Sequence, residues 1–201
     1  MEFDKVIARR RSVRSYEDRD IDDDVITLLL SYGHQAPSAG NLHPWEFIVV
    51  RDPAQRRRIV DTTFRGNDFD GTAHQEWLMQ APVLIAVVAN RARSAARYGE
   101  KAIKSLIYLD CSACIENILL GAVNLGLASC YISGFREPEL REALNLPDTH
   151  EAIAVLPVGF GAVEGQPRPK PLLADHVHYE HFSAPASGGV SVSSSPPLGE
   201  R

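Results

Sequence analysis

Cysteine is scarce in this chain, which has three among 201 residues, Cys111, Cys114 and Cys130. An odd and sparse set is poor material for the disulfide framework of a small secreted domain. Cys111 and Cys114 have the C-x-x-C spacing of zinc ligands, but no second pair or nearby histidine completes a site, and their flanks are typical of a helix interior. We therefore expect three reduced thiols that pack in the core.

A basic excess is also missing, because the formal net charge is −5. General nucleic-acid binders usually present a positive surface to the phosphate backbone, so this class is disfavoured. Long hydrophobic runs are missing as well. The apolar segments 81–89 and 114–123 are too short or too interrupted to span a bilayer, and residues 1–15 are charged rather than signal-like. We expect a cytoplasmic protein with no membrane or nucleic-acid partner.

Three common catalytic signatures are absent from the sequence. It has no Walker phosphate loop, no G-x-G-x-x-G dinucleotide loop and no G-x-S-x-G nucleophile elbow. His176, His178 and His181 have a spacing that could converge on a metal in an extended strand. Because apolar and aromatic residues alternate with them, we interpret these histidines as packing residues and expect no metal.

The residues that are present suit one compact domain. A chain of this length can bury a sizeable core, and its 44% hydrophobic and 23% charged residues are ordinary for a globular protein. Helical and extended patterns alternate without an internal repeat, which favours an α/β (α+β) fold with helices on both faces of a sheet. We place the domain at residues 1–183. Ser, Gly and Pro dominate afterwards, which predicts a flexible tail at 184–201.

Hydrophobic spacing and caps predict the order of the elements. A short helix runs into an arginine cluster, and a second helix begins after Asp22 and ends before Pro37. The remaining expectations are a loop at 34–45, a strand at 46–52, helices at 52–64 and 73–80, a strand at 82–89, a helix at 105–127 closed by Gly126, a strand at 128–135, a helix from Pro138, a strand at 152–160, and polar connections at 65–73 and 90–101.

Four arginines and a serine lie close together near the N-terminus: Arg9, Arg10, Arg11, Ser12 and Arg14. Guanidinium groups match phosphate oxygens through two parallel hydrogen bonds, so the segment indicates a phosphate site. A solvated basic face on a helix fits the same composition. On this segment alone, both interpretations stay open.

A second notable segment is the proline-bounded stretch 37–45. Its small residues would let a flat ring approach the backbone, and Asn41 supplies both a hydrogen-bond donor and an acceptor. These properties suit the edge of a heterocycle. An ordinary turn between a helix and a strand explains them equally well.

Taken together, in this order and spacing, the two segments resemble the nitroreductase family of FMN-dependent oxidoreductases. The resemblance continues through residues 73–87, 117–135, 155–160, 167–171 and 176–182, so it covers about residues 3–182. It implies the fold of that family, a central mixed but mainly antiparallel sheet flanked by helices. It also implies a homodimer with exchanged C-terminal segments and two FMN sites at the interface.

The resemblance assigns the arginine segment to the cofactor. Arg10, Ser12 and Arg11 are expected at the phosphate and ribityl region of FMN. Arg14 is expected beside the pyrimidine edge of the flavin, where a positive charge would stabilise the anionic reduced ring. Arg9 has no assigned contact.

The resemblance assigns three further groups of residues. The loop residues expected along the flavin are Pro37, Ser38, Ala39 and Asn41, and Asn41 is expected to hydrogen-bond the pyrimidine ring of its own or the neighbouring subunit. Ser133 and Gly134 match the segment whose backbone amide faces flavin N5. Arg168 and Lys170 match the basic residues that complete the phosphate site.

The activity implied is ping-pong electron transfer from NAD(P)H to a small electron-poor acceptor such as a nitroaromatic or a quinone, with no catalytic side chain. The alternatives are a dehalogenase, azoline dehydrogenase or flavin-cleaving enzyme of the same fold, and a non-catalytic FMN-binding or sensor protein. The chain departs from the family pattern in two places. His43 stands where many members have glutamine, and residues 60–105 are brief where larger members have helices that shape the substrate pocket.

Overall fold

The computed structural model describes residues 1–68, 70–163, 165–182 and 192–193. The helices are α1 (Phe3–Arg9), α2 (Asp23–His34), α3 (Pro53–Asp61), α4 (Arg91–Lys101), α5 (Ile107–Asn124) and α6 (Glu137–Ala143). The strands are β1 (Trp45–Val50), β2 (Val83–Asn90), β3 (Ala128–Ser129), β4 (His150–Gly159), β5 (Lys170–Pro171) and β6 (Val192–Ser193). Short helical turns are η1 (Ala39–Asn41), η2 (Glu76–Gln80), η3 (Ala102–Leu106) and η4 (Leu173–His176).

Four strands form the central sheet in the order β1-β2-β4-β3, and each neighbouring pair is antiparallel. The two middle strands are almost wholly buried, as their continuous apolar sequence predicts for strands covered on both faces. A register shift between Val87 and Val88 interrupts the pairing of β2 with β4. A parallel bridge joins Ser12 to Ser129 beside β3, so the sheet is mainly antiparallel, as expected.

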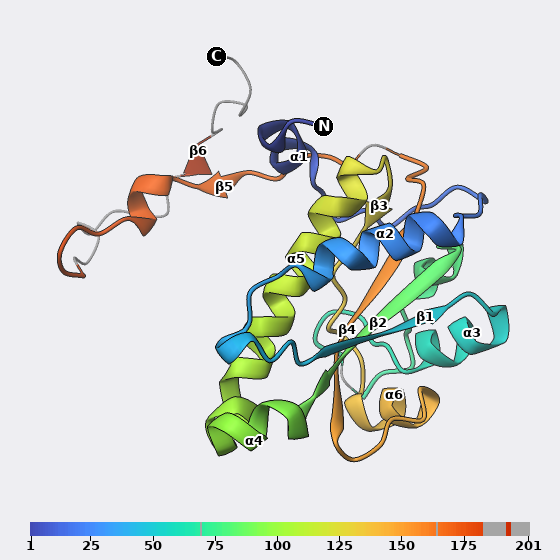
Figure 1. Ribbon diagram of the computed structural model, residues 1–201. Coiled ribbons are helices and arrows are strands. Elements are labelled where there is room, and N and C mark those ends of the chain that lie inside the picture. Colours follow the sequence, from blue (N-terminus) through green and yellow to red (C-terminus); the bar gives the residue numbers. More distant parts are fainter. Residues whose placement is uncertain (69, 164, 183–191, 194–201) are drawn as a thin grey trace.

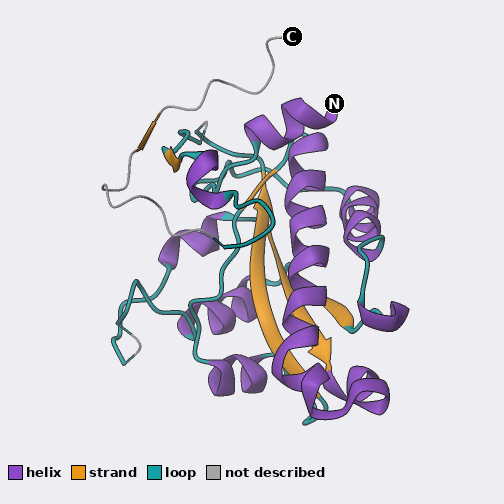
Figure 2. Cartoon of the chain, turned by 90° about the vertical axis from the view of Figure 1, so that its left-hand side faces the viewer, coloured by secondary structure: helices purple, strands orange, loops and turns teal. Residues whose placement is uncertain are grey.

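Helices cover both faces of this sheet (Figures 1 and 2). Val83, Ile85 and Val87 of β2 point to a core that includes residues of α2 and α5. Leu84, between them in sequence, belongs to a second core that includes residues of α3, η2 and α6. This alternation is the period-two pattern of a strand, and it gives the fold three layers.

The run from α4 to α5, Arg91–Asn124, is long and apolar enough, by length and composition alone, to cross a membrane. It exceeds the apolar runs visible in the sequence because the helical backbone continues through the polar residues of α4. Half of its most apolar window is buried within the chain, and α5 contacts α2 and β2. The same composition is typical of a central core helix.

Local signals set several element boundaries as expected. The Asp52 carboxylate accepts a hydrogen bond from the Gln55 N–H at 2.8 Å and caps α3. Gly126 has φ +74° just after α5, a left-handed conformation that suits glycine at a helix C-terminus. Asp22 precedes α2, but its carboxylate makes no capping hydrogen bond.

Three expectations about secondary structure are wrong. Residues 91–101, expected as part of a polar connection, form α4, which the Asn90 side chain caps by accepting from the Arg93 N–H at 3.0 Å. Ser94 is the only buried residue of α4, so this helix lacks the large apolar side chains that signal a helix in a sequence. The helix expected at 73–80 is only the short turn η2. The strand expected at 128–135 pairs continuously only at β3, with isolated bridges at Ile132 and Phe135.

The C-terminal part of the chain lies away from the sheet. In Figure 1 the segment from β5 through η4 extends from the body of the molecule, and β5 pairs with β6. Most of the tail expected at 184–201 lies outside the described residues, as does residue 183 at the expected domain boundary.

Candidate functional site

The arginine segment after α1 is extended and follows the edge of the sheet. The Val13 N–H donates to the Ser129 carbonyl at 3.1 Å, and Ser12 bridges Ser129 in parallel. Tyr16 bridges Gly161 further along. Because α1 ends at Arg9, residues 10–14 are not the basic face of a helix. Backbone pairing to β3 holds them instead.

Side chains alternate along this extended segment, as in a strand. Ser12 hydrogen-bonds the thiol of Cys130, and the charges of Arg14 and Arg10 also act on that thiol. Burial raises the pKa of Cys130, and these neighbours offset part of the rise. Val13, on the other side, is buried. Arg10, Ser12 and Arg14 therefore gather on one side, over Cys130.

Arg11 belongs to the opposite side of the segment. Its guanidinium donates to the Arg10 carbonyl at 2.8 Å, and its buried Nε has no hydrogen-bond partner within the described chain. A Cβ on Gly165 would lie 2.5 Å from the Cβ of Arg11, so the backbone at Gly165 passes directly against it. The structure thus separates Arg11 from the group formed by Arg10 and Ser12.

The guanidinium groups over Cys130 are only loosely held. Arg10 Nε lies 3.7 Å from Glu116 Oε1 on α5, which is longer than a hydrogen bond. The Arg14 guanidinium lies 5.9 Å from the centre of the Trp77 ring. Arg9, at the end of α1, is exposed. Arg10 and Arg14 can therefore turn toward an anion at little cost.

The Ser133–Gly134 turn is fixed through its carbonyl groups. Ser133 O accepts from the Phe135 N–H at 3.1 Å. Gly134 O accepts twice, from the Phe64 N–H at 3.1 Å and from the Gln75 side-chain amide at 3.2 Å. Among the described residues, no hydrogen bond has the Gly134 N–H as its donor. This N–H is a donor in a rigid position.

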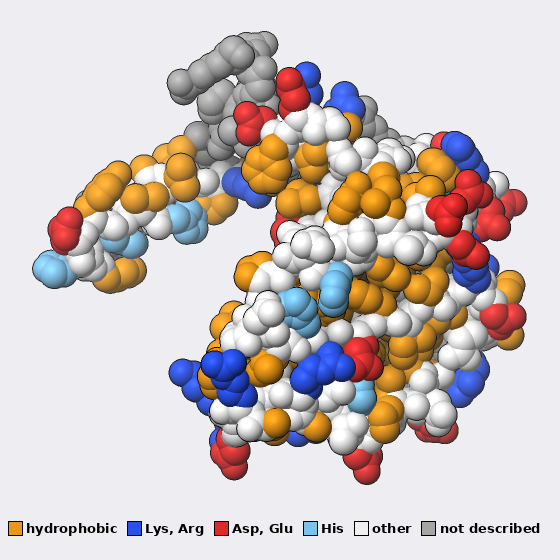
Figure 3. All heavy atoms as spheres, in the orientation of Figure 1, with side chains coloured by type: hydrophobic (Ala, Val, Ile, Leu, Met, Phe, Trp, Pro, Cys, Tyr) orange, Lys and Arg blue, Asp and Glu red, His pale blue; other side chains and the backbone are white. Residues whose placement is uncertain are grey.

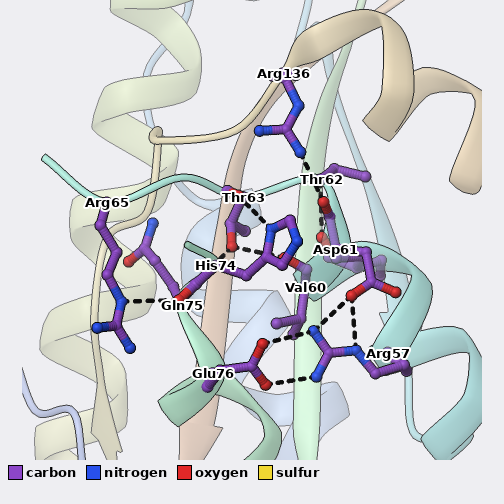
Figure 4. Close-up of polar contacts among 11 residues, drawn as sticks. Arg57, Val60, Asp61, Thr62, Thr63, Arg65, His74, Gln75, Glu76 and Arg136 are labelled. Atoms are coloured by element: carbon purple, nitrogen blue, oxygen red, sulfur yellow. Dashed lines mark hydrogen bonds and ion pairs between the residues drawn. The ribbon is translucent and has the colours of Figure 1, made fainter. Parts of the chain in front are cut away.

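A polar network anchors the segments that hold this turn (Figure 4). Arg57 of α3 binds both oxygens of Glu76 on η2, at 2.6 and 3.1 Å, and this contact lowers the pKa of Glu76. The Thr63 hydroxyl accepts from the Gln75 N–H at 2.9 Å, and His74 Nδ1 donates to the Thr63 carbonyl at 2.9 Å. The Gln75 side chain is thereby held beside Gly134.

The proline-bounded loop contacts α5 closer to the start of that helix than the arginine segment does. The Ala39 N–H donates to Asp110 Oδ1 at 3.0 Å, near the start of α5. Arg10 lies near Glu116, six residues later, a rise of about 9 Å at ~1.5 Å per residue. Figure 1 shows η1 near the α4 end of α5 and α1 near its other end. Within one chain, the structure therefore does not bring Asn41 to the arginine segment.

The loop has an unusual backbone that distant side chains support. Gly40, Asn41 and His43 have φ of +59°, +57° and +45°. From α4, Arg93 donates to the His43 carbonyl at 2.7 Å and Arg97 to the Gly40 carbonyl at 3.2 Å. This support keeps residues other than glycine in a conformation that L-residues seldom adopt.

The other expected loop residues lie beside this strained stretch. Ser38 is half-buried, and its hydroxyl accepts from the His43 N–H at 2.9 Å. Pro37 is exposed. Neither side chain approaches the Ser133–Gly134 turn through any contact in the described residues. Pro37, Ser38, Ala39 and Asn41 therefore form one group with its own supports.

Arg168 and Lys170 are exposed and lie in the segment that leads away from the sheet. Lys170 belongs to β5 and pairs with Ser193. Among the described residues, no hydrogen bond or ion pair joins either side chain to Arg10 or Ser12. The backbone at Gly165 is the nearby point of contact, against Arg11.

Several residues at these positions were not singled out from the sequence. Gln75 and Cys130 adjoin the turn and the arginine segment, and Asp110, Arg93 and Arg97 support the loop. Only Asp110 had a visible signal. It is an acidic residue within an apolar helical run, and it is buried at 8% exposure.

The cysteines have no feature of a metal site. All three are buried and free, and burial is the main cause that raises the pKa of each, to about 12 for Cys114. No group of three potential ligands occurs in the part of the chain that the structure covers. Packing as reduced core thiols agrees with the expectation.

Comparisons with known proteins give consistent family matches. The model of the nitroreductase family matches residues 7–160. A candidate NADH dehydrogenase/NAD(P)H nitroreductase of Archaeoglobus fulgidus is 35% identical over 160 residues, which is 78% of this chain and 83% of the relative. The crystal structure of a candidate NADH dehydrogenase/NAD(P)H nitroreductase from Parabacteroides distasonis has a TM-score of 0.75 at 27% identity and covers 90% of this chain and 98% of that one.

Two other similar proteins have more specialised names. Iodotyrosine deiodinase of Nematostella vectensis is 26% identical, over 82% of this chain and 69% of its own. The 5,6-dimethylbenzimidazole synthase of Rhodospirillum rubrum is 27% identical, over 79% of this chain and 81% of its own. Similarity to this chain therefore extends across several named activities.

Proposed function

The chain belongs to the nitroreductase family, and from that membership we propose that it is an FMN-dependent enzyme that passes electrons from NAD(P)H to small electron-poor acceptors. Membership makes it an oxidoreductase and implies the use of a flavin and NAD(P)H. Nitroaromatics and quinones are the proposed acceptors because they are planar and electron-poor. Donor and acceptor bind in turn at one open site, in a ping-pong sequence.

The observation that carries the choice of FMN is the grouping of Arg10, Ser12 and Arg14 on one side of the extended segment. Two guanidinium groups and a hydroxyl are the donors that a phosphate ester prefers. Arg14 lies over Trp77, and Gln75, two residues earlier, donates to Gly134 O. Both Arg14 and the Ser133–Gly134 turn therefore contact residues in or directly before η2.

A flavin mononucleotide would be held by residues of both the arginine segment and the Ser133–Gly134 turn. Arg10 and Ser12 hold its phosphate and ribityl region. Arg14 places a positive charge beside the ring, which favours negative charge there. The Gly134 N–H would donate a hydrogen bond to the edge of the ring. The flavin supplies the electron-transfer chemistry when bound, so no side-chain acid or base is needed.

Arg11, Arg168 and Lys170 take a more distant part in this proposal. Arg11 points away from Arg10 and Ser12, so its contribution is to the electrostatic field around the phosphate. Arg168 and Lys170 are exposed on the projecting C-terminal segment. They would complete the phosphate site when that segment packs against the sheet-containing part of a subunit in the dimer. The phosphate group itself is held mainly by Arg10 and Ser12.

The functional unit is a homodimer. The residues Pro37, Ser38, Ala39 and Asn41 lie apart from the arginine segment within one chain, so a second copy completes the site by bringing its loop to the flavin. Exposed apolar side chains support this association. They gather over α2 and along the projecting C-terminal segment (Figure 3), where Leu173 is 77%, Tyr179 84% and Phe182 80% exposed. Burial of such surface is a driving force for assembly.

A second candidate is a specialised enzyme of the same fold, which the similarity to a deiodinase and to a 5,6-dimethylbenzimidazole synthase favours. The two candidates share the cofactor site and differ in the acceptor. Residues 60–105, which are brief compared with larger members of the family, leave few residues to enclose a substrate. An open site of this kind suits a broad range of acceptors.

The test is turnover by the purified protein. Denaturation should release FMN, identified by its mass and fluorescence. NAD(P)H should then be oxidised anaerobically in the presence of a nitroaromatic or a quinone, with parallel double-reciprocal lines. Bound FMN without turnover would favour a non-catalytic flavoprotein. Release of iodide from iodotyrosine, or cleavage of reduced flavin, would favour a specialised enzyme, and a protein that binds no flavin would contradict the proposal.

A further inference from the structure

His43 and Asn41 make a hydrogen bond across the turn of the proline-bounded loop. His43 Nε2 lies 2.8 Å from Asn41 Oδ1. Asn41 is exposed and His43 is half-buried, so the histidine is the better anchored partner. The contact joins the residue that departs from the family pattern to the residue that we propose as a flavin contact.

The chemistry of the two groups decides the direction of this hydrogen bond. The Asn41 oxygen is an amide carbonyl and can only accept, so His43 Nε2 carries the hydrogen. The oxygen is thereby turned toward the imidazole. The Asn41 NH₂ group donates to no acceptor in the described chain, and both of its hydrogens are available to a ligand.

The imidazole is itself held from several sides. It stacks on Trp45, with ring centres 5.1 Å apart and planes 13° from parallel, and it meets the His34 ring edge-on at 5.2 Å. Trp45 is buried and donates from Nε1 to His34 Nδ1 at 3.2 Å. The plane of the His43 ring is therefore set by a buried side chain.

The backbone of His43 is fixed as well. Its N–H donates to the Ser38 hydroxyl at 2.9 Å, and its carbonyl accepts from Arg93 at 2.7 Å. Arg93 in turn binds Glu46 of β1 at 2.7 Å. These contacts join the loop to α4 and β1, so the backbone that carries the imidazole is held in place.

We propose that His43 is a positioning residue that fixes the Asn41 carboxamide with its NH₂ group toward the ligand, and so selects a ring edge rich in hydrogen-bond acceptors. This inference rests on the proposed flavin site. The carbonyl oxygens of a flavin pyrimidine ring are acceptors of this kind. A glutamine at position 43 also has a side-chain N–H and would preserve the same polarity.

The experiment compares two substitutions that distinguish the stacking contribution of the His43 ring from its hydrogen-bond donor. His43→Phe keeps a ring to stack on Trp45 but removes the donor, whereas His43→Gln keeps a donor and removes the ring. FMN affinity is measured by fluorescence quenching on the apoprotein dimer. We expect His43→Phe to weaken binding about two- to tenfold, the range for one net hydrogen bond, and His43→Gln to bind within about twofold of the original chain.

A double-mutant cycle distinguishes positioning from a structural effect. In an Asn41→Ala background there is no carboxamide to orient, so His43→Phe should change FMN affinity no further. An equal loss in both backgrounds would overturn the inference, as would unchanged affinity in the single variant. The melting temperature of each variant identifies any general loss of folding.

A measurement without cofactor provides an independent check. In the apoprotein, ¹⁵N spectra of the histidines should show hydrogen on Nε2 of His43, with the signal assigned by its loss in His43→Gln. A neutral His43 with hydrogen on Nδ1 would overturn the inference even if FMN binds. Failure of the original chain to bind FMN would overturn the proposed function and this inference together.

Discussion

The arginine segment and the proline-bounded loop are held in opposite ways. Residues 10–14 take a common extended conformation and pair through the backbone with Ser129. Within residues 37–45, Gly40, Asn41 and His43 take rare backbone conformations, and the loop depends on side chains from α4 and α5. The first segment is held mainly through its backbone, and its exposed side chains Ser12 and Arg14 do not support its own conformation. The second uses many of its polar groups to keep its own shape.

The largest expected effect follows from removing the side chains of the first segment. Arg10→Ala together with Ser12→Ala should release FMN and remove the yellow colour. One charge-assisted contact contributes about 1.5–3 kcal/mol, which is roughly ten- to 150-fold in affinity. Fluorescence titration with FMN measures the loss. Arg9→Ala is the control, because this exposed neighbour has no assigned contact. Wild-type affinity in the double variant would remove the assignment.

A smaller effect is expected from straining the loop. Gly40 and Gly66 have nearly the same φ, +59° and +57°, but a Cβ on Gly40 would lie 2.6 Å from Tyr98 Oη, whereas one on Gly66 meets nothing within 4 Å. Gly66→Ala should cost about 1 kcal/mol of folding stability through its φ alone. Gly40→Ala should cost more, up to about 3 kcal/mol, and weaken FMN binding.

Urea denaturation and FMN titration measure both glycine variants. If Gly40→Ala binds FMN normally while it loses stability, the loop is structural and does not contact the cofactor. Equal stability losses in the two variants would show that Tyr98 and Arg97 move aside freely.

Acid should affect the loop through Glu46, with a modest effect. Burial raises the pKa of Glu46, but hydrogen bonds from Asn90 and His150 and the charges of His150 and Arg93 outweigh it, so the net pKa lies below its ordinary value of 4.5. The resulting stabilisation is fully present above pH 4.5 and is lost as the pH falls through the lowered pKa. Because its side chain is 41% exposed, the contribution is under about 1 kcal/mol.

The two tryptophans allow this acid effect to be located. Trp45 reports on the loop and Trp77 on the arginine segment, so a Trp77→Phe background isolates the loop signal. We expect Glu46→Gln to flatten the dependence of Trp45 fluorescence on pH below 4.5. Glu76→Gln is the matched control, because Glu76 also has a lowered pKa but anchors η2. Equal responses in both variants would indicate general unfolding.

The smallest difference is expected among the thiols. Cys130 lies beneath the arginine segment, and Cys111 and Cys114 lie in the core beside α2. If backbone pairing keeps the segment closed, iodoacetamide should alkylate all three equally slowly at pH 8 and quickly in denaturant. Mass spectrometry of timed samples measures this. Earlier alkylation of Cys130 would show that the arginine segment opens on its own.

Local patterns predicted much of the fold. The caps at Asp52 and Gly126 and the apolar runs of β2 and β4 are short-range signals, and these elements occur as expected. The helix α4 was missed because it buries only Ser94 and so has no face of large apolar side chains. The strand after α5 was overestimated because a β-prone sequence does not determine whether a partner strand is present.

The candidate site shows the same division. Arg10, Arg11, Ser12 and Arg14 could be chosen from the sequence because their chemistry and spacing are local, but only the structure separated Arg11 from the other three. Gln75 and the residues that support the loop, Asp110, Arg93 and Arg97, could not be chosen, because each makes its contact with a residue far away in the sequence. The Gln75 side chain, for example, reaches a carbonyl 59 residues away.

The sequence by itself determined the family, the choice of the arginine segment as a candidate site, and the packing of the three cysteines in the core, since each follows from residue type and short spacing. Only the tertiary structure decided that residues 10–14 are extended along β3, because Ser129 supplies the paired carbonyl from more than a hundred residues away. The tertiary structure also decided that the Asn41 carboxamide turns its oxygen toward His43 Nε2, since the direction of a hydrogen bond depends on which groups meet in space.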